Sequence, residues 1–120
     1  MKDLPVYFVS RSAWRDWLEA NHASSDGITV GMIKKAADFP GVYLDEVVDE
    51  ALCFGWIDSL ARSVDDKRWS IRMSPRKPNS PWSARNIARV ERLIAEGRMT
   101  PAGLVVFERR NTPKRTSESA

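Results

Sequence analysis

Cysteine and histidine are nearly absent from this chain: among its 120 residues, Cys53 is the only cysteine and His22 the only histidine. A single cysteine excludes an intramolecular disulfide. A structural zinc site takes about four ligands, most of them cysteine or histidine, and these residues cannot supply one. We therefore predict neither a metal centre nor a bound cofactor.

Long hydrophobic runs are also missing. No apolar stretch approaches the ~20 residues that a membrane-spanning helix needs, and residues 1–5 are not followed by the apolar segment of a secretory signal peptide. These absences predict a cytoplasmic protein without a membrane span. The length suits one hydrophobic core, so we expect a single domain over residues 1–110 and a disordered, polar tail over residues 111–120.

Basic side chains are scarce in the first half of the chain and acidic ones in the second. Residues 1–66 hold six basic and twelve acidic side chains, whereas residues 67–98 hold nine basic and two acidic ones. The net charge of +3 therefore hides a segregation along the chain. A basic half favours phosphate, carboxylate or nucleic-acid partners, and it equally favours ion pairs with the acidic half of the same molecule.

Hydrophobic periodicity predicts an α+β fold, with a small antiparallel sheet that includes a central β-hairpin and with helices packed on one face. Capping residues indicate the helix limits: Ser10 or Ser12 begins the first helix, Ser83 caps a later one, and Pro101 occupies the first position of the last. The predicted elements are strand 6–9, a helix to residue 22, strand 27–35, helix 44–52, hairpin strands 56–63 and 68–75, a helix ending at residue 97 and helix 101–107.

Apolar side chains at helical spacing indicate which helix faces enter the core. The first predicted helix carries Trp14 and Trp17 on one face. The helix after residue 83 carries Ile87, Val90 and Ile94 on one face. We expect both stripes to be buried.

Tryptophan, arginine, serine and asparagine gather between residues 53 and 86, around two predicted turns. The helix that begins near Ser83 offers unpaired N–H groups there, and a planar guanidinium pairs with carboxylate or phosphate through two donors. We therefore predict a surface site for a polar or anionic small molecule or a protein partner. Its candidate residues are Trp56, Asp58, Arg72, Arg76, Trp82, Ser83, Asn86 and Arg89.

A structural interpretation competes with this site. The three arginines could instead pair with Asp45, Glu50 or Asp58 and hold the loop in place. Trp56 fits the core better than a ligand platform, whereas Trp82 fits either. Both interpretations of the arginines stay open at this point.

Catalysis would depend on Asp58 or Cys53. Asp58 follows an apolar pair, so it could be a buried carboxylate suited to acid–base chemistry. Cys53 lies near a predicted helix C-terminus, where the dipole raises a thiol pKa and argues against a nucleophile. Ser83 and Asn86 are spaced as an N-cap and its N3 partner, which fits better than a serine nucleophile. We favour a non-catalytic binding protein, with a small enzyme as the alternative.

A weak nucleic-acid binder is the second alternative. Arginines that follow phosphates and aromatic rings that stack on bases are typical of single-strand binding. No RRM, KH or helix-turn-helix motif is present in the sequence. The sequence therefore argues against nucleic acid as the main partner.

Five segments in one order are similar to a known family: WRDWLE at 14–19, EALCFGWID at 50–58, SPR at 74–76, SPWS at 80–83 and GRMTPAGL at 97–104. Through them the chain resembles the YdeI or OmpD-associated family, also labelled bacteriocin-protection. The resemblance implies a short member of that family and a stress-protection role, with resistance to bacteriocins or antimicrobial peptides and association with an outer-membrane porin. It implies no reaction. Val30 and Gly31 stand where relatives tend to carry a bulkier pair, so we expect looser packing there.

Overall fold

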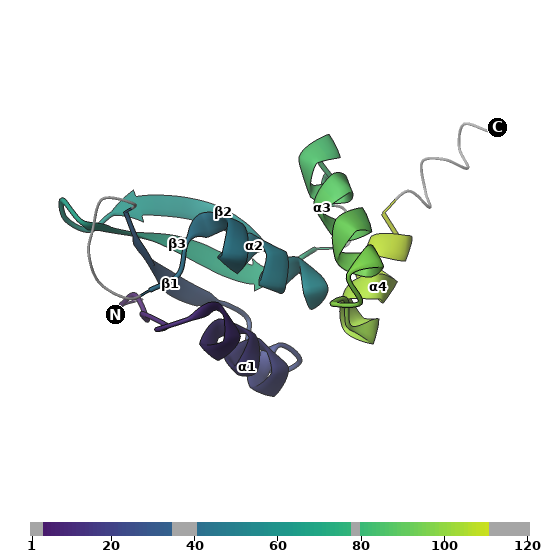
Figure 1. Cartoon of the computed structure of the whole chain (residues 1–120), viewed down its shortest axis with the longest axis horizontal. Helices are drawn as coiled ribbons and strands as arrows, with labels where there is room; N and C mark the ends of the chain where they lie inside the picture. Colours follow the sequence, from purple (N-terminus) through teal and green to yellow (C-terminus); the bar gives the residue numbers. More distant parts are fainter. Residues whose placement is uncertain (1–3, 35–40, 78–79, 111–120) are drawn as a thin grey trace.

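The computed structural model describes residues 4–34, 41–77 and 80–110. Within these ranges the chain forms four α-helices and a three-stranded antiparallel sheet with the strand order β1-β3-β2 (Figure 1). The predicted α+β fold is confirmed, while the tail predicted for residues 111–120 lies outside the described residues. The elements in chain order are α1 (Arg11–Asn21), β1 (Ile28–Ile33), α2 (Leu44–Cys53), β2 (Trp56–Ser63), β3 (Arg68–Pro75), α3 (Ala84–Ala95) and α4 (Pro101–Glu108).

The β-hairpin forms at its predicted bounds and supplies two of the three strands of the sheet. Strand β3 lies in the middle and is antiparallel to both neighbours. Gly55 turns the chain from α2 into β2 with a φ of 79°, a left-handed conformation that glycine adopts without the steric cost of a Cβ. The register of β2 shifts between Asp58 and Ala61, so a β-bulge interrupts this edge strand.

The N-terminal segment does not form the antiparallel strand predicted for residues 6–9. Val6 makes one isolated bridge to Val30 of β1, and this bridge is parallel. The Val6 N–H donates to the Thr29 carbonyl at 2.9 Å, and the Gly31 N–H donates to the Val6 carbonyl at 2.8 Å. The prediction is therefore wrong, because this segment contributes one parallel bridge at Val6 before Ser10 caps α1.

Packing over Gly31 is tight, contrary to the looser packing predicted for this position. Gly31 is buried, and the ring of Tyr7 occupies the place where a Cβ would project. Tyr7 reaches this place because the preceding residue, Val6, is bridged to Val30. An aromatic ring from the N-terminal segment therefore fills the space that a bulkier side chain in β1 would take.

Tryptophans form the centre of the core, where α2 packs on β2 and α1 packs beside α2 (Figure 1). Trp14 and Trp56 have exposed fractions of 0% and 1%, so both lie in the core as predicted. Trp17 stacks on Trp14 and meets Trp56 edge-on, with ring centroids 5.7 Å apart in each pair. The Trp14 indole N–H donates to the Val47 carbonyl of α2 at 3.1 Å, which satisfies the polar atom of that ring.

Helices α3 and α4 lie beyond one end of the sheet and pack mainly on α2 (Figure 1). Val90 and Leu93 are the buried residues of α3, whereas Ile94 is 46% exposed. The predicted stripe is therefore wrong at Ile94. Leu93 and Ile94 lie one turn after Val90, on either side of it on the same helix face, and the packing of α3 buries the first of them.

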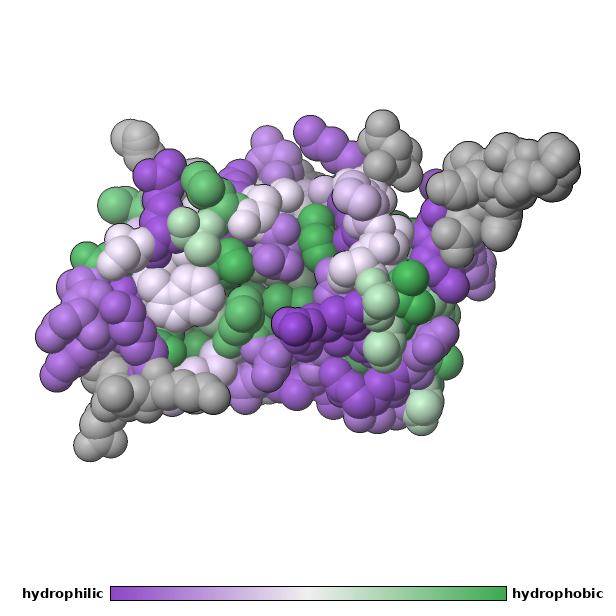
Figure 2. All heavy atoms as spheres, turned by 90° about the horizontal axis from the view of Figure 1, so that it is seen from above, coloured by the Kyte–Doolittle hydropathy of each residue, from purple (hydrophilic) through white to green (hydrophobic). Residues whose placement is uncertain are grey.

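The surface combines hydrophilic and hydrophobic regions. Figure 2 shows hydrophilic side chains over much of the end that carries α3 and α4, and hydrophobic side chains exposed in the middle of the same face. Within the described ranges, no helix has both the length and the apolar character needed to cross a membrane.

Candidate functional site

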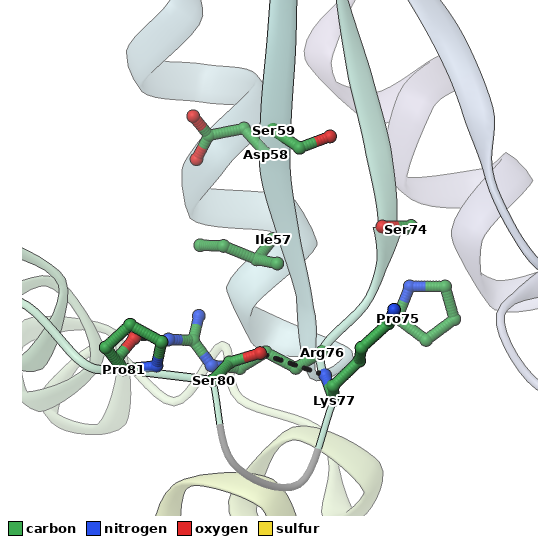
Figure 3. A pocket seen from close by; sticks show the side chains of 9 residues that line it. All are labelled: Ile57, Asp58, Ser59, Ser74, Pro75, Arg76, Lys77, Ser80 and Pro81. Atoms are coloured by element: carbon green, nitrogen blue, oxygen red, sulfur yellow. Dashed lines mark hydrogen bonds between the residues drawn. The ribbon is translucent and has the colours of Figure 1, made fainter.

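A surface hollow of about 470 Å³ lies where the start of β2 pairs with the end of β3, and we call it the Arg76 hollow. Figure 3 shows Arg76, Lys77, Ser80 and Pro81, which follow β3 in the sequence, along one border of it. Carboxylate, hydroxyl and cationic groups share its wall with apolar side chains. The lining residues are Ile57, Asp58, Ser59, Ser74, Pro75, Arg76, Lys77, Ser80 and Pro81.

Arg76 is held by an aromatic ring and a backbone carbonyl. Its Cζ atom lies 3.8 Å from the centroid of the Trp82 ring, a cation–π contact, and its Nη2 donates to the Pro81 carbonyl. Its Nε and Nη1 are buried and have no hydrogen-bond partner in the described part of the chain. Burial lowers the pKa of Arg76, and the charge of Asp58 opposes that shift. Because a buried donor without an acceptor costs about 1–3 kcal/mol, an acceptor at this guanidinium would be bound favourably.

The hollow contains charges of both signs. Figure 3 shows the Asp58 carboxylate and the Arg76 guanidinium on the same side of the hairpin, with Ile57 between them. The Lys77 N–H donates to the Ser80 hydroxyl at 3.2 Å, which ties together the two sides of the segment after β3. The wall therefore offers a hydrogen-bond acceptor and charged donors to the same small volume.

Only part of the predicted site meets at this hollow. Asp58 and Arg76 line it, and Trp82 supports the Arg76 guanidinium. Ser83 and Asn86 are close in sequence but serve α3, because the Ser83 hydroxyl accepts from the Asn86 N–H at 3.1 Å. This is the N-cap arrangement that their spacing predicts.

The other two predicted arginines are placed elsewhere. The Arg72 guanidinium lies against Gly27, at the start of β1. Arg89 donates to Asp45 at 2.9 Å and to Asp49 at 3.1 Å. Its charge is therefore used inside the molecule, as the structural interpretation of the arginines expects.

An aromatic series connects the hollow to α4. The Trp82 ring meets Phe107 edge-on at 5.4 Å, and the Arg110 guanidinium lies 3.7 Å from the Phe107 centroid. Together with Arg76 these side chains form a row of cation, two rings and cation. The row fixes Trp82, and through it Arg76, against the last helix.

The sequence named Glu50 as a possible ion-pair partner, but it did not predict that this carboxylate is fully buried or that Arg11, Arg15 and Arg98 are its partners. Glu50 of α2 has an exposed fraction of 0%, and its oxygens accept from Arg11, from Arg15 at 2.7 Å and from Arg98 at 2.5 Å. Burial alone would raise the pKa of Glu50, but hydrogen bonds from these three arginines hold it below its usual value. The signal in the sequence is Asp49-Glu50, two acids inside an otherwise apolar run of α2.

Asp49 continues this cluster toward α3. It is 5% exposed and accepts from Arg89 at 3.1 Å and from Arg92 at 2.9 Å. Arginines from α1, α3 and the α3–α4 loop thus converge on two adjacent acids of α2. The cluster joins helices and leaves these two acids almost no exposed surface for a ligand.

Comparison with known families shows which family the chain belongs to. A family described as a domain of unknown function, DUF8412, matches residues 6–106. The chain belongs to this family. No curated protein and no solved structure matches it. The DUF8412 match includes the Arg76 hollow and the Glu50 cluster, and it names no ligand.

Cys53 of this DUF8412 domain is fully buried. Burial, followed by the charge of Glu50, raises the pKa of its thiol, and the side chain of Arg15 acts in the opposite direction. A buried thiol in its neutral form is a poor nucleophile. In residues 4–34, 41–77 and 80–110, no group of three or more histidine, cysteine, aspartate or glutamate side chains is placed to hold a metal ion.

Proposed function

We propose that this DUF8412 domain is a non-catalytic binding module whose ligand places an anionic group in the Arg76 hollow. The observation that carries this proposal is the Arg76 guanidinium, which is half-buried and keeps two buried nitrogens without a partner among the described residues. A carboxylate or phosphate is the group that best satisfies such donors. Lys77 adds a second positive charge to the same wall.

A comparison with the neighbouring arginines supports this assignment. Arg89 and Arg92 donate to carboxylates of α2 and α3, so their charges are already balanced. Arg76 forms no such ion pair with another described residue, and it is stabilised by the Trp82 ring and one carbonyl instead. The charge of Arg76 therefore remains available to a ligand.

A small enzyme that uses Asp58 is the alternative function. Its support is that Asp58 shares the hollow with Arg76 and Lys77, which could stabilise developing negative charge. Binding is favoured because neither Cys53 nor His22 lines the hollow, and Cys53 is buried. A binding role needs only the groups that are in place.

The biological setting stays a prediction. The resemblance to the YdeI or OmpD-associated family implies protection against bacteriocins or antimicrobial peptides. The DUF8412 match carries no link to that role. A ligand-binding module is compatible with a part in stress protection, and the experiment below tests the binding alone.

Titration of the wild-type protein with acetate and with inorganic phosphate, followed by the NMR signal of the Trp82 indole N–H, tests the proposal. We expect a saturable shift, since Trp82 lies on the Arg76 guanidinium. Arg76→Ala should weaken binding about tenfold or more, because a hydrogen bond to a charged group contributes about 1.5–3 kcal/mol.

Arg62→Ala is the matched control, because it removes the same charge from an exposed position of β2 beyond the bulge. It should bind like the wild type. The proposal fails if no carboxylate or phosphate ligand, zwitterionic ones included, gives a saturable shift, or if Arg76→Ala lowers stability in urea while binding stays at the wild-type level.

A further inference from the structure

The Arg76 hollow presents two opposite charges that do not neutralise each other. Asp58 and Arg76 both line it, and the charge of Asp58 is near enough to act on the Arg76 guanidinium. Yet the two side chains form no ion pair, and Asp58 makes none with any other described residue. A half-buried acid and a half-buried base thus line one hollow and are held apart, with the Ile57 side chain between them in Figure 3.

Two opposite charges held apart in one hollow favour a ligand that carries both charges over a simple ion. A free carboxylate or phosphate would gain from Arg76 and Lys77 but would be repelled by Asp58. A free amine would gain from Asp58 but would be repelled by both cations. A ligand that carries both charges turns each repulsion into an attraction, so the pair of opposite charges in the wall matches a pair in the ligand.

We propose that the natural ligand of the Arg76 hollow is a small zwitterion of the amino-acid type, whose ammonium group donates to Asp58 and whose carboxylate accepts from Arg76. This inference rests on the proposed function. Ser74 and Lys77 also line the hollow and add polar groups to it. The volume of about 470 Å³ is in the range of small-molecule sites, about 300–1,000 Å³.

Four ω-amino acids of increasing charge separation test the inference: glycine, β-alanine, γ-aminobutyrate and 6-aminohexanoate. Each is titrated into the wild-type protein beside its N-acetyl derivative, which keeps only the carboxylate, and its amide, which keeps only the amine. We expect at least one zwitterion to bind tenfold or more tightly than both of its derivatives. The separation of Asp58 from Arg76 determines which one.

Two variants assign the charges. Asp58→Asn should remove the preference for the zwitterion over its N-acetyl derivative, while Arg76→Ala should remove binding of both. Asp66→Asn is the control, because it neutralises an exposed carboxylate in the turn between β2 and β3 and should leave the preference intact.

The outcomes separate this inference from the proposed function. If the N-acetyl derivatives and acetate bind through Arg76 as tightly as the zwitterions, the zwitterion is excluded and the anion site stands. A preference that survives Asp58→Asn excludes it equally. If no ligand shows binding that depends on Arg76, both proposals fall.

Discussion

Glu50 shows how one residue organises several helices. It receives hydrogen bonds from two arginines of α1 and from Arg98 between α3 and α4, so it joins three parts of the chain at one carboxylate. Such a group is stable only while its partners are present. Removal of one charge from a buried ion cluster leaves the others uncompensated, and this typically costs about 3–5 kcal/mol.

Glu50→Gln should therefore lower the free energy of unfolding by about 3–5 kcal/mol, measured by urea denaturation. Glu19→Gln is the matched control, because the Glu19 side chain is 58% exposed and lies 3.7 Å from the same Arg15. An exposed pair contributes about 0–1 kcal/mol, so the control should be close to the wild type. Equal effects of the two substitutions would show that the Glu50 cluster is not a stabilising contact.

The same variant should change the acid limb of the stability curve. The arginines lower the pKa of Glu50 in the folded protein below its unfolded value of 4.5. The stabilisation is therefore complete above pH 4.5 and is lost as the pH falls through the folded pKa. Asp65, whose pKa Arg68 lowers to about 2, acts in the same direction. Urea midpoints below pH 4.5 should fall less steeply in Glu50→Gln than in the wild type, and parallel curves would contradict this origin.

At the level of elements, the docking of α4 on the end of α2 depends on one glycine. A Cβ at Gly103 would overlap the backbone carbonyl of Cys53. The Thr100 hydroxyl and the Thr100 N–H donate to that same carbonyl, at 2.6 Å and 3.1 Å. Three contacts with one peptide group thus place α4, and they leave no room for a larger residue at its third position.

Gly103→Ala should therefore destabilise the protein, although alanine is normally better than glycine inside a helix by about 0.5–1 kcal/mol. We expect a loss of about 2 kcal/mol in urea denaturation, since backbone must shift to admit the methyl group. Val105→Ala on the exposed side of α4, where Val105 is 44% exposed, should stay within about 0.5 kcal/mol of the wild type. Stabilisation by Gly103→Ala would show that α4 does not approach α2 this closely.

For the molecule as a whole, many of the charges that are segregated along the sequence pair with each other inside the fold. Arginines of α3 and its following loop pair with Asp45, Asp49 and Glu50 of α2, forty or more positions earlier in the chain. The basic half and the acidic half meet at the packing of α3 on α2. The positive field left for an external polyanion is reduced accordingly.

Nucleic acid should therefore bind only weakly at physiological salt. Fluorescence anisotropy with a short single-stranded oligonucleotide across a salt series measures this, because binding through phosphates weakens steeply as salt rises. We expect no sub-micromolar affinity near ~150 mM salt. A sub-micromolar affinity that is lost in Trp82→Ala would show that the protein binds nucleic acid, which the sequence argues against.

Local features of the fold were predictable because each depends on residues that are near in sequence. The hairpin follows from the alternation of apolar and polar side chains along its strands. The caps at Ser83 and Thr100 follow from side-chain hydroxyls that accept backbone N–H groups, and the turn at Gly55 follows from a glycine in the left-handed conformation. The same reasoning gathered Asp58, Arg76 and Trp82 into one candidate site, because they lie at the start of β2 and just after β3, which a hairpin brings together.

Tertiary structure alone decided which charges find partners and which side of a helix is buried. Arg89 and Arg76 look alike in the sequence, yet one meets two acids of α2 and the other meets an aromatic ring and a hollow. In the same way, the packing of α3 buries Leu93 and leaves Ile94 exposed. These outcomes depend on contacts between segments far apart in the chain, whose relative positions no local pattern specifies, whereas caps and turns involve atoms only a few bonds away.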